Sequence, residues 1–367
     1  MAMEGSVNQP GYVAFMRVLE GDMEGLRHAS RTAQGRTQPY FEIVKTRPRK
    51  SDRGASFVVR AADWIVDTWR LKGPAFVELV DEPGPEENNW FPSQDHTLVL
   101  LHRYFRQKNV TAIPTIPLDR TGPYREAFLK VASVASSGMA VRLYADDLEL
   151  PSETIAKLRK LGLEARRANS EIDLIINVQR IKLDQLNLLR SKILDFLAAL
   201  AAEAPYRSIT LVGTSVPESL SEVVPENEER EVPRLELRLW REVCAAYGRL
   251  IGLGDYLIVR PEYDDRKGGF DNINAKIFYT TDKSTYIVRG KSRKKEKLED
   301  QYPNLTQRLT RSGVFQDAEF SWGDARIAEY AQRGQAPGSP KIWIVIGISH
   351  HIELVSAQVA VEFARAE

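Results

Sequence analysis

The sequence contains a single cysteine, Cys244, among 367 residues. One thiol excludes a disulfide within the chain, a redox pair of cysteines and a zinc site built from several cysteines. The sequence also lacks an excess of either charge, because 51 Lys and Arg residues stand against 50 Asp and Glu residues. The balance therefore disfavours a protein that binds nucleic acid through a uniformly basic surface, although it leaves a local basic patch open.

Long hydrophobic runs are also missing. The longest apolar stretches, such as residues 342–348, are far shorter than the roughly 20 residues of a membrane-spanning helix. The N-terminus carries Glu4 and no apolar segment typical of a signal peptide. We therefore expect a soluble, cytoplasmic protein that has no membrane partner, and the sequence leaves its oligomeric state open.

Two familiar site motifs are incomplete. Arg289-Gly-Lys-Ser292 resembles the end of a phosphate-binding loop, but Thr285 occupies the position of the first glycine. Gly213-Thr-Ser-Val-Pro217 lacks the closing glycine of a nucleophile elbow, which indicates an ordinary turn at Ser215. No metalloprotease, EF-hand or deaminase pattern is present. The reaction, if there is one, is therefore not given by a known short motif.

Short runs of β-branched and aromatic residues recur along the first 260 residues, with room for one helix between each pair. They predict strands at Val13–Val18, Tyr40–Lys45, Ala75–Val80, Thr111–Pro117, Met139–Tyr144, Ile172–Asn177, Ser208–Gly213 and Asp255–Val259. Eight β-α units in series favour parallel pairing and a closed (β/α)8 TIM-like barrel, an α/β fold. An open, doubly wound sheet is the alternative.

The last third of the chain departs from this rhythm. Ala275–Thr281 and Tyr286–Arg289 indicate a β-hairpin, Lys294–Leu309 and Asp324–Arg333 indicate helices, and Ser339-Pro340 is typical of a helix start. We expect residues 10–263 and 340–366 to form the barrel, which places the eighth barrel helix at Lys341–Ala364. Residues 264–339 would be an inserted hairpin with helices packed on the barrel as part of one compact unit.

Five predicted strands carry a charged residue between apolar ones: Arg17, Glu42, Glu78, Arg142 and Asp173. Side chains alternate along a strand, so these charges should point into the barrel while their neighbours face the helices. Buried charges must be satisfied by one another or by a ligand. We expect Arg142 to pair with Asp173 on the next strand. A closed ion-pair network that only fills the barrel is the structural alternative to a functional pocket.

Further polar residues follow the strands, on the face where barrel enzymes keep their sites. The candidate catalytic carboxylates are Glu42, Glu78, Asp119 and Asp173, and the candidate substrate-binding residues are Arg17, Arg142, Arg260, Arg289 and His350. Clustered carboxylates suit acid–base chemistry or a divalent cation such as Mg²⁺, although no metal ligand can be assigned. His350 is adjacent to His351, and the pair could instead begin the outer face of the last helix.

Two charge runs belong near the same face. Residues 218–231 are mostly acidic, and residues 289–297 are mostly basic. The two runs could be solvated loops or could pair with each other. Alternatively, Arg289–Lys297 could attract a nucleic acid or another polyanion.

Several short motifs resemble, in their order, those of the bacteriophage T4 beta protein family, which occurs in phages and many bacterial genomes. They are Tyr12-Val-Ala-Phe-Met-Arg17 with Glu20-Gly-Asp22, Pro39-Tyr-Phe-Glu-Ile43, Ile113-Pro-Thr-Ile-Pro117, Arg142-Leu143 with Asp146-Asp-Leu148, Asp173-Leu174, Gly254-Asp-Tyr256, Tyr279-Thr280, Arg289-Gly290, Gln301-Tyr302, Phe320-Ser-Trp-Gly-Asp324 and Gly347-Ile-Ser-His-His351. The resemblance implies a phage-related or anti-phage defence setting, and it brings no activity or catalytic residue with it.

Two classes of function stay open, so the chain is not assigned as an enzyme at this point. One is a hydrolase or lyase that acts on a phosphorylated or nucleotide-like substrate. The other is a non-enzymatic protein of a phage or anti-phage system that binds a protein or nucleic-acid partner. An open pocket that reaches Glu42, Glu78 and Asp173 would favour the enzyme, and a filled barrel with every charge paired would favour the interaction protein.

Overall fold

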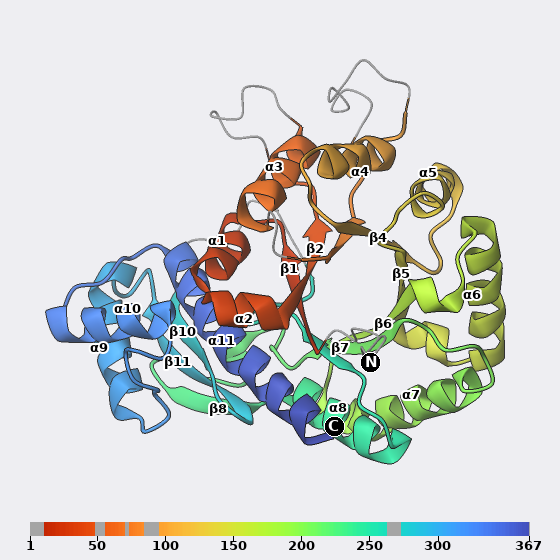
Figure 1. Ribbon diagram of the computed structural model, residues 1–367. Coiled ribbons are helices and arrows are strands. Elements are labelled where there is room, and N and C mark those ends of the chain that lie inside the picture. The colour runs from red at the N-terminus through yellow and green to blue at the C-terminus, as the bar shows by residue number, and fades with distance from the viewer. Residues whose placement is uncertain (1–10, 48–55, 70–72, 84–94, 263–272, 367) are drawn as a thin grey trace, which may run out of the picture.

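In the computed structural model, eight parallel strands pair side by side until the last meets the first (Figure 1). The structure describes residues 11–47, 56–69, 73–83, 95–262 and 273–366. In pairing order the strands are β1 (Tyr12–Arg17), β2 (Thr37–Ile43), β3 (Ala75–Leu79), β4 (Ala112–Pro117), β5 (Met139–Tyr144), β6 (Ile172–Arg180), β7 (Ser208–Thr214) and β9 (Gly252–Asp255). The closure of β9 onto β1 confirms the (β/α)8 barrel and rules out the open sheet.

Helices cover the outside of the barrel, as Figure 1 shows. After β1 come α1 (Glu20–His28) and α2 (Arg31–Arg36), and the following strands are each followed by one of α3 (Phe57–Trp69), α4 (Thr97–Gln107), α5 (Gly122–Ala132), α6 (Pro151–Ala165), α7 (Leu186–Leu200) and α8 (Leu235–Tyr247). Short 3₁₀ turns lie at Ala145–Leu148, Asn169–Glu171, Leu183–Gln185 and Leu220–Glu222. The final helix, α11 (Pro340–Ala366), packs against α1 and α2 and closes the ring, as expected for the eighth barrel helix.

Local chemistry sets several helix ends. The Ser321 hydroxyl accepts a hydrogen bond from the backbone N–H of Asp324 at 3.0 Å and caps the helix that follows. Pro340 is the first residue of α11, where its missing N–H costs no hydrogen bond. Gly248 ends α8 with a φ of 74°, a left-handed conformation that glycine adopts without strain.

The eighth barrel strand lies earlier than Asp255–Val259, the position that we predicted for it. Gly254 lets β9 approach β1 and β7 closely, because a β-carbon there would meet the Val13 carbonyl oxygen at 3.1 Å. Leu257 has a φ of 55°, so the chain leaves the extended conformation just after the strand. A strand signal based on β-branched residues misses a strand that contains two glycines.

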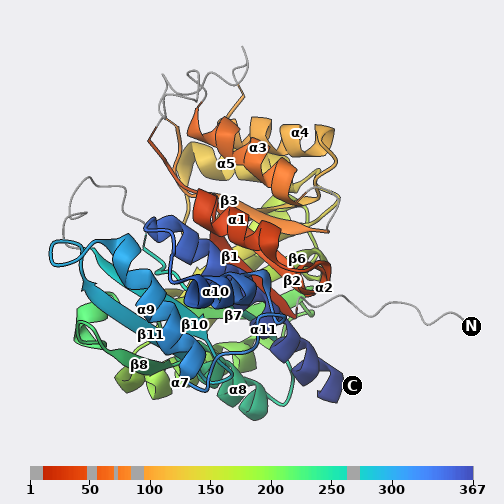
Figure 2. The ribbon, with the colours of Figure 1, turned by 90° about the vertical axis from the view of Figure 1, so that its left-hand side faces the viewer.

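A three-stranded antiparallel sheet lies beside the barrel, with strand order β10 (Asn274–Thr280), β11 (Ser284–Ser292) and β8 (Glu229–Pro233). Helices α9 (Leu298–Arg311) and α10 (Trp322–Arg333) accompany it (Figure 2). β10 and β11 are the predicted hairpin. β8 comes from the acidic run before β9, so it was not part of the predicted insertion, and it pairs with β11. Residues 264–272 of that insertion are not among the residues that the structure describes.

α11 lies between this sheet and the barrel, and it contributes to both hydrophobic cores. Its Ile348 and Val355 belong to the barrel core, whereas Trp343 and Ile346 pack with the sheet. By length and composition α11 could cross a membrane, which the short apolar runs of the sequence did not indicate. However, 67% of its most apolar 18-residue window is buried, as in a core helix of a globular protein.

The middle of the barrel is filled with apolar and aromatic side chains, which include Val13, Phe15, Tyr40, Phe76, Ile113, Ile175 and Val212. These residues occupy the alternating positions of their strands that face inward. The five charged residues identified from the sequence share these positions, which confirms the predicted strand parity. Charged layers therefore lie above and below an apolar layer.

Candidate active site at the C-terminal end of the barrel

A network of buried charges occupies the C-terminal end of the barrel. Arg142 on β5 donates from one nitrogen, Nη1, to Glu42 Oε1 on β2 and to Glu78 Oε2 on β3, both at 2.8 Å. All three side chains are within two residues of the C-terminal end of their strands. One guanidinium therefore holds two carboxylates from strands far apart in the sequence.

Tyrosine and asparagine side chains complete the network. The Tyr40 hydroxyl donates to Glu78 Oε2, and Tyr256 accepts from Arg142 Nη2 at 3.2 Å and from Asn177 at 2.7 Å. The Arg142 guanidinium also lies 4.9 Å from the centre of the Tyr144 ring, a cation–π distance. Aromatic side chains thus fix the orientation of the arginine.

Burial changes how the network holds protons. It raises the pKa of Glu42 above its ordinary value; the Arg142 and Arg17 charges oppose this rise, and the Glu78 charge adds to it. Burial also works against the charge of Arg142, but Glu78 and the other neighbours hold its pKa well above the ordinary value. The arginine therefore stays charged, and Glu42 takes up a proton more readily than an exposed glutamate does.

One donor of the network has no acceptor. The Nε atom of Arg142 is buried and has no hydrogen-bond partner among the described residues. A buried N–H without an acceptor costs free energy, so native structures leave few of them. Both carboxylates of the network have hydrogen-bond partners, whereas the Arg142 Nε has none among the described residues.

Asp173 does not join this network, so the expected Arg142–Asp173 pair is wrong. Asp173 is the second residue of β6, opposite Ala140, whereas Arg142 is opposite Ile175. The Asp173 carboxylate is bound instead by Arg207, with Nε to Oδ1 at 2.9 Å and a second bond from Nη2, and by the Ser208 hydroxyl at 2.7 Å. These residues lie at the N-terminal end of the barrel.

Three of the candidate substrate-binding arginines line one cavity at the C-terminal end. Arg17, Arg260 and Arg289 surround a space of about 580 Å³ between the barrel and the added sheet. Glu42 and Glu78 do not line it, and they are only 5% and 3% exposed. Arg17 connects the two regions, because it lines the cavity and its charge acts on Glu42.

The remaining candidates lie apart. His350 is fully buried in α11, where its ring nitrogens bond to Asp324 and to the Thr280 carbonyl, so it neither faces solvent nor reaches the cavity. His351, and not His350, contacts the barrel, through Asp255 at 3.0 Å. Asp119 is exposed on the loop after β4, close enough to Tyr144 for its charge to act there.

The acidic and basic runs partly pair with each other. Lys295 donates to Glu226 at 2.6 Å, the Arg289 guanidinium bonds to the Val224 carbonyl at 2.6 Å, and β8 pairs with β11. Arg293, Lys294 and Lys297 stay exposed and have no carboxylate within ion-pair distance in the described ranges. Lys291 pairs with Glu296 inside the basic run, so the contacts between the two runs involve only Arg289 and Lys295 of its six basic residues.

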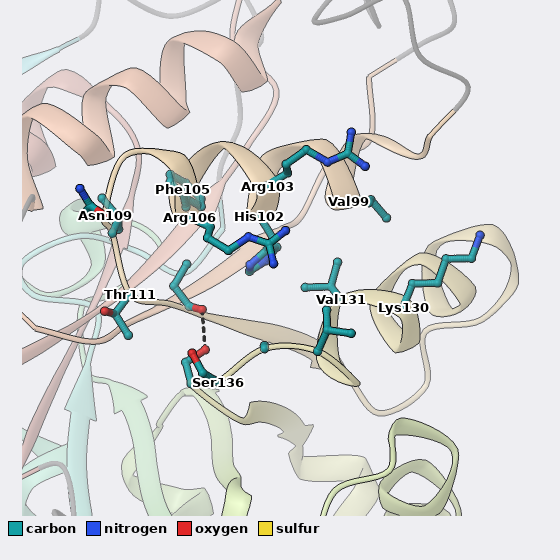
Figure 3. Close-up of a pocket in the computed structure, with 15 residues that line it drawn as sticks. Val99, His102, Arg103, Phe105, Arg106, Asn109, Thr111, Lys130, Val131 and Ser136 are labelled. Atoms are coloured by element: carbon teal, nitrogen blue, oxygen red, sulfur yellow. Dashed lines mark hydrogen bonds between the residues drawn. The ribbon is translucent and has the colours of Figure 1, made fainter.

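Another cavity, of about 520 Å³, lies between α4 and α5 (Figure 3). Burial lowers the pKa of His102 there to about 3, so this ring is neutral, and its Nε2 has no partner among the described residues. The lining includes Thr111 and Ser136, which precede β4 and β5, so the cavity opens at the N-terminal end of the barrel. It contains none of the candidate residues.

Metal ligands do not gather anywhere in the described part of the chain, where no three His, Cys, Asp or Glu side chains come together. A divalent cation at Glu42 and Glu78 would also have to displace Arg142. The arrangement therefore suits proton transfer better than metal binding.

Sequence reasoning missed Tyr40, Asn177 and Tyr256, which bond to the charged residues. Tyr40 precedes Glu42 by two residues, so the alternation that identified Glu42 also places Tyr40 inside the barrel. Arg207, which binds Asp173, precedes β7 and has no such signal.

A family model described as Beta protein matches residues 12–357, which is nearly the whole chain and agrees with the resemblance seen in the motifs. No curated protein and no solved structure matches the sequence.

Proposed function

The chain belongs to the Beta protein family. From the geometry of its buried charge network we propose that it is an enzyme that carries out acid–base chemistry at the C-terminal end of its barrel. The substrate is a small phosphorylated or nucleotide-like molecule, and the reaction is a hydrolysis or an elimination. Glu42 transfers the proton, Glu78 and Arg142 hold Glu42 in place, and Arg17 contacts the substrate anion. Asp119 lies at the rim of the barrel. Asp173 takes no part in the proposed reaction, because it lies at the N-terminal end of the barrel.

The observation that carries the proposal is the binding of Glu42 and Glu78 to the same nitrogen of Arg142. Two carboxylates bound to the same nitrogen repel each other, which favours a proton on one of them. The raised pKa of Glu42 indicates where that proton is held. A carboxyl whose pKa is raised in this way holds a proton more readily and can donate it, which suits general acid–base catalysis.

The position of the network supports the same function. TIM-barrel enzymes use residues from the C-terminal ends of several strands, and Arg17, Glu42, Glu78 and Arg142 come from four strands at that end. The buried Arg142 Nε has no acceptor among the described residues and would donate to a substrate oxygen that enters the network. Because Arg17 lines the cavity and Glu42 does not, we expect the substrate to reach Glu42 only if the Arg17 side chain moves.

The test is a comparison of variants on a mixture of natural substrates. Purified protein is incubated with a metabolite extract, and mass spectrometry follows which compounds are consumed. We expect consumption of at least one phosphorylated compound by the wild type and a loss of about 100-fold or more in Glu42→Gln, the scale of a general acid–base contribution. Glu171→Gln, an ion-paired glutamate at the opposite end of the barrel, is the matched control. No consumption by the wild type, or equal consumption by Glu42→Gln, would contradict the proposal.

A second candidate function is a non-enzymatic interaction protein of a phage or anti-phage system. The observation that favours it is the burial of Glu42, Glu78 and Arg142, whose charges satisfy one another without a ligand. The exposed Arg293, Lys294 and Lys297 would then contact a nucleic acid or an acidic protein. Replacing these three with glutamine should abolish the binding of a labelled oligonucleotide under this alternative, and should change nothing under the first proposal.

A further inference from the structure

The cavity at the C-terminal end is lined by more positive than negative side chains. Arg17 comes from β1, Arg260 follows β9, and Lys276 and Arg289 come from β10 and β11. Asn274, Lys276 and Phe278 alternate along β10, so one face of this strand forms a wall of the cavity. Figures 1 and 2 show the sheet of β8, β10 and β11 beside the barrel.

Three of these cations have no carboxylate partner among the described residues. Arg260 donates to the Glu218 carbonyl at 2.9 Å. Arg289 donates to the Val224 carbonyl at 2.6 Å and to Asn274 Oδ1 at 3.2 Å, and its buried Nε has no acceptor. Lys276 makes no ion pair in the described ranges, and its amine lies 5.9 Å from the centre of the Phe278 ring. Neutral acceptors orient the two guanidinium groups and leave their charges uncompensated.

The acidic side chains of the cavity are already bound to another arginine. Glu218 and Glu262 both pair with Arg180, at 3.0 Å and 2.6 Å. Among the described residues neither forms an ion pair with Arg260, Lys276 or Arg289. Every carboxylate that the cavity contains is engaged in this way.

The cations also act on one another. Desolvation lowers the pKa of Lys276 from its ordinary value, and the charges of Arg260 and Arg289 lower it further. Like charges held together cost stability unless a counter-charge lies between them. A bound anion would remove this repulsion and accept a hydrogen bond from the Arg289 Nε.

We propose that Arg260, Lys276 and Arg289 bind the phosphate group of a small molecule in this cavity. A phosphate dianion matches this charge better than a carboxylate, and its oxygens suit arginine donors. The volume of about 580 Å³ lies within the range of small-molecule sites, roughly 300–1,000 Å³. The inference deepens the proposed function and rests on it only for the identity of the substrate, because the anion site stands without catalysis.

The anion site and the acid–base network meet at Arg17. Arg17 Nη2 donates to the Arg260 carbonyl, and the Arg17 charge acts on Glu42. A phosphate bound beside Arg260 attracts the Arg17 guanidinium toward the cavity. That movement would open the approach to Glu42 and would couple binding of the phosphate group to access of the rest of the substrate.

The test measures binding of inorganic phosphate and pyrophosphate to the full chain by titration calorimetry, with acetate as the carboxylate probe. We expect saturable, one-to-one binding of the phosphates, weaker binding of acetate, and a loss of about tenfold or more in Lys276→Gln, as for a charge-assisted contact. Lys283→Gln removes an exposed lysine from the far end of the same hairpin and should bind like the wild type. Arg260→Gln is a second variant and should weaken binding similarly.

Folding of the variant is checked in the same experiment. Lys276→Gln removes a repelled charge and no hydrogen bond, so its melting temperature without phosphate should equal or exceed that of the wild type. Phosphate should then raise the melting temperature of the wild type more than that of the variant.

Several results would overturn the inference: no saturable phosphate binding by the wild type, or equal binding by Lys276→Gln and Lys283→Gln. Tighter binding of an oligonucleotide that Lys294→Gln weakens as much as Lys276→Gln would also overturn it, because the basic run would then be a polyanion surface. Glu42→Gln should still bind phosphate. Phosphate binding without turnover of any metabolite would therefore reject the proposed enzyme and support the anion site. Turnover without phosphate binding would support the enzyme and reject the anion site.

Discussion

Asp173 and Arg207 form a two-point ion pair at the N-terminal end of the barrel, closed by a hydrogen bond from Ser208. This pair and the Arg142 network lie on opposite sides of the apolar layer in the barrel. The barrel therefore contains two separate sets of charges, and they should respond independently to substitution.

We expect a double-mutant cycle to measure this separation. Asp173→Ala and Arg207→Ala should be coupled by about 0.5–3 kcal/mol in free energy of unfolding, because the groups are in direct contact. Asp173→Ala and Arg142→Ala should be additive within about 0.5 kcal/mol. Urea unfolding of the single and double variants gives both values, and strong coupling of Asp173 to Arg142 would show that the two sets communicate.

Removal of Arg142 should destabilise the protein strongly. Arg142→Ala leaves Glu42 and Glu78 buried without their shared cation, and breaking a buried pair costs about 3–5 kcal/mol. Glu42→Gln should cost much less, because Glu42 already binds a proton readily and Arg142 keeps Glu78. Denaturant unfolding of the two variants at neutral pH provides the comparison. A larger loss in Glu42→Gln would mean that Glu42 is held as a charged structural partner.

Stability should fall with rising pH because of Asp22. Burial raises the pKa of Asp22 to about 7 from the ordinary 3.8, against the effect of Arg17. The folded state then binds a proton that the unfolded state has released. Stability from this group is present below about pH 4, decreases as the pH rises to about 7, and is constant above that. The full effect is on the order of 4 kcal/mol.

Asp22→Asn should remove this dependence, since asparagine still accepts a hydrogen bond from the Arg17 N–H and cannot ionise. Between pH 5 and pH 8 the wild type should lose stability relative to the variant. Unfolding curves at several pH values give the difference, and parallel pH profiles would mean that Asp22 is ionised in the folded protein throughout.

Gly323 should not tolerate a side chain. A β-carbon there would overlap the backbone carbonyl of Ile346, where α10 crosses α11, and overpacking of this kind costs about 1–3 kcal/mol. A β-carbon at Gly35, in α2, would meet no atom within 4 Å. Gly35→Ala should therefore stabilise the protein by about 0.4–1 kcal/mol, through the reduced freedom of the unfolded chain. Thermal unfolding of the two variants tests the close approach of the helices.

The repeating β-α pattern was sufficient to predict the barrel. Strands such as Met139–Tyr144 are apolar apart from one inward-facing charged residue, because helices cover one face and the barrel interior buries the other. β8 was missed because Glu229-Arg-Glu-Val-Pro233 is polar and partly exposed on both faces, so its position depends on pairing with β11 rather than on burial.

The alternation of side chains along the strands identified which charged residues face inward, but not which of them contact one another. Arg142 and Asp173 are on neighbouring strands and both point inward, yet the stagger of β5 against β6 separates them by one inward-facing position. The partners of Glu42 and Glu78 lie across the barrel, a relationship that depends on closure rather than on local sequence. The anion cavity was harder to foresee, because it needs the added sheet to be placed against the barrel.

The double packing of α11 has a consequence for the order in which the protein folds. The ribosome makes α11 after all the other described elements, yet both hydrophobic cores need its side chains. Until α11 has emerged, β1 and α1 on one side and β10 on the other expose apolar surface. Neither core is fully buried before α11 docks, so the nascent chain exposes apolar surface until late in its synthesis.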